Sequence, residues 1–235
     1  MAKNTYVLIP GAGGAAWYWN EVAPLLSAAG HRVIAVDLPA ADPTAGLSEY
    51  ADTVCVAVAG GSADTQGPVV LVAQSMGAFT APLVSERLPS ELIVLVNPMV
   101  PAPGESASQW WAATGQKAAM VKHLTDLGLG RTSFDMVEDF FHDVPPTVRE
   151  AAMRAGEPEQ ADKPFDEPWP LAAWPDIATV VIQGSDDRLF PLEFQRRVVR
   201  DRLGPDVEMA VLPGGHLMAL SHPHELAEQI LGYPV

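Results

Sequence analysis

The sequence predicts an α/β fold, a mostly parallel sheet with helices on both faces and a helical cap insertion. Three observations predict it. Short apolar runs alternate with helical patterns along the chain. These runs are apolar throughout rather than at every second residue, which is typical of strands buried on both faces. Between residues 99 and 175 no such run occurs, and a plain loop of this length is uncommon in a compact domain.

The first part of the predicted core, residues 1–98, alternates strands and helices regularly. In chain order we expect a strand at Tyr6–Ile9, a helix at Trp17–Ala29, a strand at Arg32–Val36, a helix at Ser48–Val58, a strand at Val69–Val72, a helix at Met76–Leu88 and a strand at Leu92–Val96. Gly30 follows the first helix as a C-cap, because glycine adopts the left-handed conformation there without strain.

Residues 99–175 form the predicted cap. They are rich in Pro, Trp and Met and contain short helical stretches. The second part of the core, residues 176–235, resumes the alternation. We expect a strand at Ile177–Gln183, a helix at Leu192–Leu203, a strand at Val207–Leu212 and a helix at Pro223–Leu231. An insertion at this place covers the carboxyl edge of the sheet, where α/β sheets bind their ligands.

Composition and charge limit the class of protein and its partners. The chain has 235 residues, of which 48% are hydrophobic and 18% charged, as in a globular protein. The net charge of −15 argues against nucleic acid and anionic membranes as partners. The one cysteine, Cys55, excludes an internal disulfide. The chain starts without a cationic, then apolar, leader and has no apolar run of ~18 residues, so we expect a soluble cytoplasmic protein.

Ser75 stands between a buried strand and a helix. Its neighbours two positions away, Ala73 and Gly77, are small. A strand that turns into a helix within about one residue requires small neighbours there, and it exposes the serine hydroxyl above the sheet. The positive end of the new helix then points at whatever binds. This stretch resembles the nucleophile elbow of the α/β-hydrolase family, with alanine in the first position.

The resemblance extends to two further loops. In that family the serine is followed by an acid and then by a histidine, each after a strand. Gly184–Pro191 is similar to the family's G-x-x-D-x-x-x-P acid loop and places the acid at Asp187, with Asp186 as the alternative. His216 follows Gly214-Gly215 after the Val207–Leu212 strand. The resemblance therefore implies a triad of Ser75, Asp187 and His216.

The family also needs backbone N–H donors for a developing alkoxide. The resemblance implies that Met76, after the nucleophile, and Ala12, after the first strand, supply them. Two positions depart from the family pattern. Pro10-Gly11 stands where relatives often carry His-Gly, and Gln74 stands where many carry histidine. These departures bear on the subfamily rather than on the triad.

Aromatic residues recur near the predicted site loops and in the cap, which predicts an apolar pocket for a small molecule. The candidates for lining it are Gly11, Trp17, Gln74, Trp110, Trp111 and His142. We expect no metal site, because no carboxylates cluster with histidine at ligand spacing and no HExxH or CxxC occurs. We expect no cofactor either.

A nucleotide-binding protein is the alternative from another class. Residues 11–16 fit G-x-G-x-x-A between a strand and a helix, and Asp37 ends the next strand where a ribose-binding acid would stand. This interpretation leaves the elbow, the acid loop and the histidine loop unexplained. The aromatic run Trp17–Trp19 would also crowd the place of the pyrophosphate.

The residues together predict a serine hydrolase, a carboxylesterase acting on small or medium apolar esters, lactones or thioesters through an acyl-enzyme. Family members that keep the fold but not hydrolysis include hydroxynitrile lyases, cofactor-free haloperoxidases and non-catalytic receptors, and these remain open. A small apolar molecule is the expected partner. The sequence also leaves open that the protein forms a homodimer.

Overall fold

The computed structural model describes residues 3–60, 67–156 and 158–235. Its centre is a six-stranded sheet in the order β2-β1-β3-β4-β5-β6, in which every neighbouring pair is parallel. The strands are β1 (Thr5–Ile9), β2 (Arg32–Ala35), β3 (Val69–Gln74), β4 (Leu92–Val96), β5 (Ala178–Gly184) and β6 (Met209–Leu212). The predicted parallel sheet is confirmed, and each strand begins and ends within two residues of its expected bounds.

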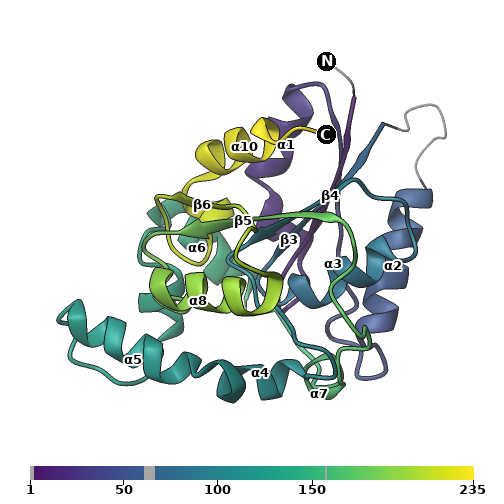
Figure 1. Ribbon diagram of the computed structural model, residues 1–235. Helices are drawn as coiled ribbons and strands as arrows, with labels where there is room; N and C mark the ends of the chain where they lie inside the picture. Colours follow the sequence, from purple (N-terminus) through teal and green to yellow (C-terminus); the bar gives the residue numbers. More distant parts are fainter. Residues whose placement is uncertain (1–2, 61–66, 157) are drawn as a thin grey trace.

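Helices connect the strands and cover the sheet (Figure 1). In the core they are η1 (Ala16–Trp19), α1 (Val22–Ala28), α2 (Leu47–Ala59), α3 (Gly77–Ser85), α8 (Leu192–Leu203), α9 (Met218–Ser221) and α10 (Pro223–Gly232). Between β4 and β5 lie α4 (Ala107–Thr114), α5 (Gln116–Asp126), the π-helical turn η3 (Met136–Phe140), α6 (Pro146–Ala155) and α7 (Lys163–Asp166).

The sheet separates two hydrophobic clusters. On β1, Val7 and Ile9 face the cluster that includes residues of α2, α3 and α8. Tyr6 and Leu8 face the other cluster, which includes residues of η1, α1, α9 and α10. Because successive side chains point to opposite faces, a strand covered on both faces needs apolar residues at every position. This explains the unbroken apolar runs of the sequence.

The strand order fixes where a site can form. After β1 the chain moves outward to β2, and then returns to place β3 on the other side of β1. The loops that leave β1 and β3 therefore run in opposite directions, and open α/β sheets bind their ligands beyond the carboxyl ends of the strands at such a point. Ile9 pairs with Ala73 in this register, so the loop after β1 and the turn after β3 start side by side.

The helix predicted at Trp17–Ala29 is wrong as one element. The structure divides it into the 3₁₀ turn η1 and the α-helix α1, with a break at Asn20-Glu21. Pro24 explains the break, because proline lacks an N–H and its ring clashes in a helix interior but is tolerated in the first turn. By restarting at Val22, the chain places Pro24 in the first turn of α1.

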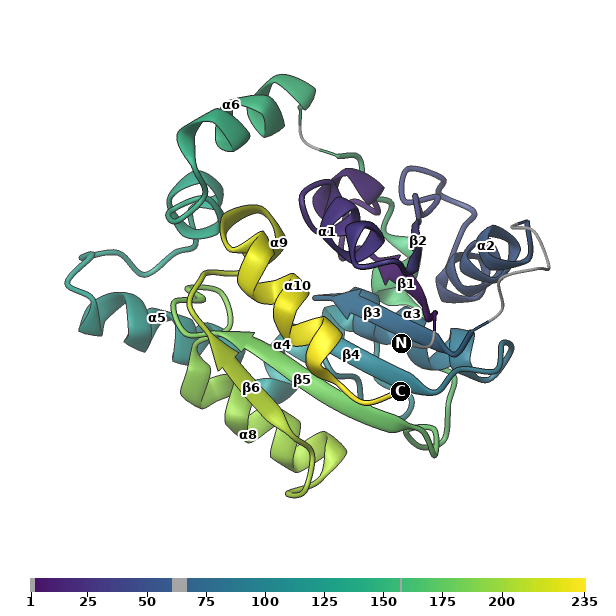
Figure 2. The same ribbon diagram turned by 90° about the horizontal axis from the view of Figure 1, so that it is seen from above.

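The segment between β4 and β5 is helical, and no strand interrupts it in the part of the chain that the structure describes. Seen from above, α5 and α6 lie beyond the edge of the sheet (Figure 2). The cap boundaries at residues 99 and 175 stay a prediction. Within the described ranges, no helix combines the length and apolar character that crossing a bilayer requires.

Candidate active site

The turn after β3 holds Ser75 in a strained conformation. Its φ is +50°, in the left-handed region that non-glycine residues rarely adopt. Only two residues separate the end of β3 from the start of α3 at Gly77. A Cβ at Gly77 would lie 2.8 Å from the carbonyl oxygen of Pro10, so a larger residue would push α3 away from β1. The tight turn therefore needs a glycine two positions after the serine.

Three side chains from distant parts of the chain meet at this turn. The Ser75 hydroxyl lies 3.1 Å from Nε2 of His216. The other ring nitrogen of His216, Nδ1, lies 2.8 Å from Oδ2 of Asp187. All three residues are buried. Such a chain lets the imidazole accept the hydroxyl proton while the carboxylate fixes the tautomer and stabilises the positive charge.

The acid loop distinguishes the two neighbouring aspartates. Asp187 is fully buried, and its Oδ1 accepts the backbone N–H groups of Leu189 and Phe190, each at 2.8 Å. These bonds hold its carboxylate and leave Oδ2 for His216. Asp186 is exposed and accepts hydrogen bonds from the Ser185 hydroxyl and the Gly214 N–H. The Ser185 hydrogen bond is the largest of the effects that lower the pKa of Asp186.

Two phenylalanines enclose the His216 ring. Phe140, at the end of η3, stacks on it with a centroid distance of 5.2 Å and an interplanar angle of 24°. Phe190, in the acid loop, meets it edge to face at 4.9 Å and 88°. The imidazole is 2% exposed. One wall of the candidate site therefore comes from the segment between β4 and β5, and apolar rings flank the imidazole.

The loop after β1 forms a turn beside Ser75. The Gly14 N–H donates to the Gly11 carbonyl at 3.1 Å, and Gly13 has a φ of +84°. Gly13 also donates its N–H to Oε1 of Gln160 at 2.8 Å. Among the described residues, no acceptor is found for the backbone N–H of Ala12 or of Met76. Within the described part of the chain, both predicted oxyanion donors therefore have an N–H without a protein acceptor.

The tryptophans proposed for the pocket lie in three different environments. Trp110 is fully buried, and its indole N–H donates to the Val100 carbonyl at 2.8 Å. Trp17 is 38% exposed at the start of the 3₁₀ turn. Trp111 is half-buried and contacts Phe190. Trp110 thus belongs to the core packing, and only Trp111 combines partial exposure with a contact to the ring beside His216.

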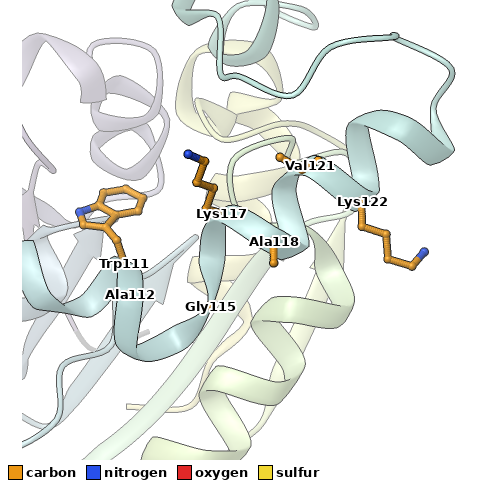
Figure 3. A pocket seen from close by; sticks show the side chains of 7 residues that line it. All are labelled: Trp111, Ala112, Gly115, Lys117, Ala118, Val121 and Lys122. Atoms are coloured by element: carbon orange, nitrogen blue, oxygen red, sulfur yellow. The ribbon is translucent and has the colours of Figure 1, made fainter.

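Trp111 also borders a shallow apolar groove of about 650 Å³ on α4 and α5 (Figure 3). Its lining residues are Trp111, Ala112, Gly115, Lys117, Ala118, Val121 and Lys122. Gly115 links the two helices in a left-handed conformation, with φ +69°. Neither Ser75 nor His216 lines this groove, so it lies outside the candidate active site.

The other pocket candidates contact the site loops. Gln74 is buried beneath the turn after β1, where a Cβ on Gly11 would lie 2.4 Å from its Oε1. The close approach explains a glycine at position 11. His142 lies against the histidine loop, and a Cβ on Gly215 would lie 2.6 Å from its Nε2. The next residue, Asp143, accepts the Gly215 N–H at 2.6 Å.

Asp37 has a structural partner rather than a free carboxylate. Its Oδ1 accepts the Ala16 N–H at 2.7 Å and so holds the start of η1. Later in η1, Tyr18 and Trp19 are buried. The features that matched a nucleotide-binding protein therefore serve the packing of the first turn. Within residues 3–60, 67–156 and 158–235, no three His, Cys, Asp or Glu side chains gather as a metal ion would require.

Three residues beside the site went unnoticed in the sequence. Phe140 and Gln160 come from the segment between β4 and β5, where no periodic pattern or motif indicates which side chains face the sheet. Asn97 directly follows β4 and bonds to the histidine loop. A polar residue at the carboxyl end of a buried strand was a usable signal, because Ser75 occupies the same place after β3.

Comparison with known proteins agrees with this architecture. Residues 6–229 match the alpha/beta hydrolase family. Polyneuridine aldehyde esterase of Rauvolfia serpentina is 24% identical over 97% of this chain and 95% of its own length. Methylesterase 1 of Arabidopsis thaliana is 34% identical over a shorter region, 40% of this chain and 38% of its own length.

A solved structure shows the likeness in three dimensions. A pyrethroid hydrolase from Sphingobium faniae JZ-2 superposes with a TM-score of 0.73 at 23% identity, covering 98% of this chain and 96% of that one. At this level of identity the superposition shows a common fold. The fold described above is thus shared with that solved structure.

Proposed function

The chain belongs to the alpha/beta hydrolase family, and we propose that it is a serine hydrolase that cleaves carboxylic esters. One observation carries the proposal: Ser75, at a strained strand-to-helix turn, is hydrogen-bonded to His216, which is hydrogen-bonded to Asp187. The names of the similar proteins, which include an esterase, a methylesterase and a pyrethroid hydrolase, support ester hydrolysis as the reaction.

In the proposed first step Ser75 attacks the carbonyl carbon of the ester. As the new C–O bond forms, Nε2 of His216 takes the hydroxyl proton, and Asp187 stabilises the resulting imidazolium. The tetrahedral intermediate collapses when the C–O bond to the alcohol breaks. His216 donates its proton to the departing alkoxide, which leaves as the alcohol. The acyl group remains bound to Ser75.

In the second step water replaces Ser75 as the nucleophile, and His216 again acts first as base and then as acid. His216 takes a proton from the water as its oxygen attacks the acyl carbon, and returns that proton to Ser75 Oγ as the carboxylic acid departs. In both steps negative charge develops on the carbonyl oxygen. The free N–H groups of Ala12 and Met76 are the proposed donors to it, each contributing about 3 kcal/mol if they behave like other oxyanion donors.

The surroundings of His216 favour an apolar substrate. The two phenylalanine rings leave apolar surface beside the imidazole, and the reacting groups are buried. A charged acyl or alcohol group placed against these rings would lose part of its hydration, which costs free energy. We therefore propose small or medium apolar esters, lactones or thioesters as substrates.

The test is steady-state turnover of p-nitrophenyl esters of increasing acyl length by the wild type and by Ser75→Ala. We expect the substitution to reduce kcat by about 10⁴-fold or more, because the acyl-enzyme no longer forms. The melting temperature should stay within about 2 °C, since one small hydroxyl is removed. Ser85→Ala is the matched control, because that hydroxyl donates within α3, to the carbonyl of Pro82.

The outcomes separate the alternatives. Multiple turnover that is lost in Ser75→Ala and kept in Ser85→Ala supports the esterase. A single acylation followed by retention of the product indicates a receptor. Absence of ester turnover, with Ser75-dependent cleavage of a cyanohydrin, indicates a lyase on the same residues. Ester turnover that survives Ser75→Ala contradicts the proposal.

A further inference from the structure

Backbone strain is concentrated at two positions of the sheet edge. Among the described residues, only Ser75 and Asn97 have a positive φ without being glycine, at +50° and +45°. Asparagine tolerates this left-handed conformation better than most residues, but it still costs free energy. Such conformations persist where the surroundings determine them, and they cluster at functional sites. The strain at Ser75 belongs to the proposed nucleophile, so the strain at Asn97 calls for its own explanation.

The side chain of Asn97 joins two loops of the proposed site. It is fully buried at the end of β4. Its Oδ1 accepts the N–H of Gly184, which ends β5 and leads into the acid loop, at 2.8 Å. Its Nδ2 donates to the carbonyl of Gly215 at 3.0 Å and to the carbonyl of His216 at 3.1 Å. One amide thus bonds to the backbone of the acid strand and of the histidine itself.

The main chain around Asn97 also bonds to the turn that holds Ser75. Ser75 donates its N–H to the carbonyl of Val96 at 3.0 Å, and Met99 donates its N–H to the carbonyl of Ser75 at 3.0 Å. Asn97 itself donates its N–H to the carbonyl of Ile182 on β5, also at 3.0 Å. Residues 96–99 are therefore bonded to the backbone at Ser75, at the acid strand and at the histidine loop.

The histidine loop needs such a support. It contains two consecutive glycines, and Gly214 has a φ of +124°. Glycines leave a loop many accessible conformations, so the loop sequence alone does not fix where the imidazole lies. Misplacement of a reacting group by about 1 Å can cost about 100-fold in rate.

We infer that Asn97 is a positioning residue, which holds the main chain of His216 in place between Ser75 and Asp187. The inference rests on the proposed function for its effect on turnover. Asn97 has no contact with the reacting atoms themselves, and it acts through the backbone of the residue that does. Its left-handed conformation accompanies an amide bonded to the two loops, as that of Ser75 accompanies a hydroxyl bonded to His216.

The first test is Asn97→Gly, because glycine keeps the positive φ and removes all three side-chain hydrogen bonds. We expect kcat for p-nitrophenyl butyrate to fall about 30- to 100-fold, with KM changed by less than about threefold. The rate at which a fluorophosphonate labels Ser75 should fall in parallel. Ile230→Ala is the control for lost stability, because Ile230 is fully buried on α10 and belongs to no site loop.

A second variant, Asn97→Asp, separates the two sets of bonds. Its carboxylate still accepts the Gly184 N–H but has no N–H for the carbonyls of Gly215 and His216. We expect the same loss of kcat. In the proton NMR spectrum, the low-field Nδ1–H resonance that His216 shares with Asp187 should broaden or disappear in both Asn97 variants and remain in Ile230→Ala.

The NMR readout keeps this inference separate from the esterase proposal. If the wild type hydrolyses no ester, the proposed function fails, but a resonance that depends on Asn97 still supports the positioning role. Wild-type kcat per folded molecule in Asn97→Gly, together with an unchanged His216 resonance, overturns the inference. A loss no larger than that of Ile230→Ala at equal folded fraction overturns it as well.

Discussion

The edge of the sheet and the segment that covers it are held by different kinds of contact. At the sheet edge, Asp187 and the residues around Ser75 are fixed by backbone hydrogen bonds among fully buried groups. The covering segment, residues 131–156 and 158–160, reaches these loops through a few side chains instead. These contacts include the Phe140 ring on His216, the Asp143 carboxylate on Gly215, the Gln160 amide on Gly13 and the Arg188 guanidinium on the Glu138 carbonyl.

Exposure follows the same division. The central strands β1 and β4 are buried at every position, whereas α6 has no fully buried residue. Large hydrophobic side chains exposed in the covering segment are Met136, Val137 and Met153. Regions with few buried contacts open at a lower free energy than the core. The covering segment is therefore expected to open more readily than the sheet edge.

The largest effect is expected at the sheet edge, from Asp187→Asn. An amide cannot stabilise the imidazolium and favours the wrong tautomer of His216, so we expect kcat to fall by about 10³- to 10⁴-fold. Asp186→Asn is the matched control, because that neighbouring carboxylate bonds to Ser185 and Gly214 instead. Steady-state kinetics of both variants measure the difference. A greater loss in Asp186→Asn would show that the acid is wrongly assigned.

A smaller effect is expected from the covering segment, in Phe140→Ala. The substitution removes the ring stacked on His216, and aromatic pairs contribute about 0.5–1.5 kcal/mol beyond their buried area. We expect kcat/KM to fall by about tenfold, mainly through KM, because the triad bonds remain. Phe134→Ala is the control, since Phe134 packs on Phe140 but not on the histidine. A loss of kcat as large as that of Asp187→Asn would erase the distinction between the two regions.

The smallest effect on turnover is expected at the ion pairs of the covering segment. Burial alone would raise the pKa of the Asp139 carboxyl, but hydrogen bonds from Arg131 and from the Asp135 N–H, with the charges of Arg131 and Arg188, lower it below its usual 3.8. Because the pKa is lower in the folded chain, this stabilisation is fully present above pH 3.8. It is lost as the pH falls through the lower folded value.

We expect Asp139→Asn to change kcat at pH 7 by less than about threefold. It should destabilise the covering segment by about 2 kcal/mol, less than for a fully buried pair because the Arg131 side chain is 25% exposed. Hydrogen exchange of residues 131–144 between pH 7 and pH 3 measures this. In the wild type, the protection factors should decrease as the pH falls below 4. In the variant, they should be lower at pH 7 and should change less with pH. Asp126→Asn is the control. It removes an exposed ion pair with Lys122 and should change neither kcat nor the protection of residues 131–144.

The sequence was informative where the physics is local or periodic. Unbroken apolar runs predicted parallel strands, and small residues around Ser75 predicted the tight turn. The loops after β5 and β6 carried acid and histidine patterns that the topology brings to one edge. Parallel strands place their carboxyl ends on the same side, so such an edge follows from the strand order.

The rest depends on contacts that leave no local pattern. Nothing around Phe140 or Gln160 indicates that these side chains reach loops more than seventy residues away in the chain. The helix predicted at Trp17–Ala29 was wrong as one element because its periodic pattern runs across Pro24, and proline is disfavoured in a helix interior. Asn97 was readable only as a polar residue after a strand, and its three bonds require the folded positions of β5 and the histidine loop.

The central claim is that Ser75 is the nucleophile activated by His216. The most direct measurement is peptide mapping by mass spectrometry after reaction with a fluorophosphonate. We predict one adduct per chain, on the peptide that contains Ser75, absent in Ser75→Ala and formed at least about 100-fold more slowly in His216→Ala. An adduct on another residue, or labelling that persists in Ser75→Ala, would contradict the account.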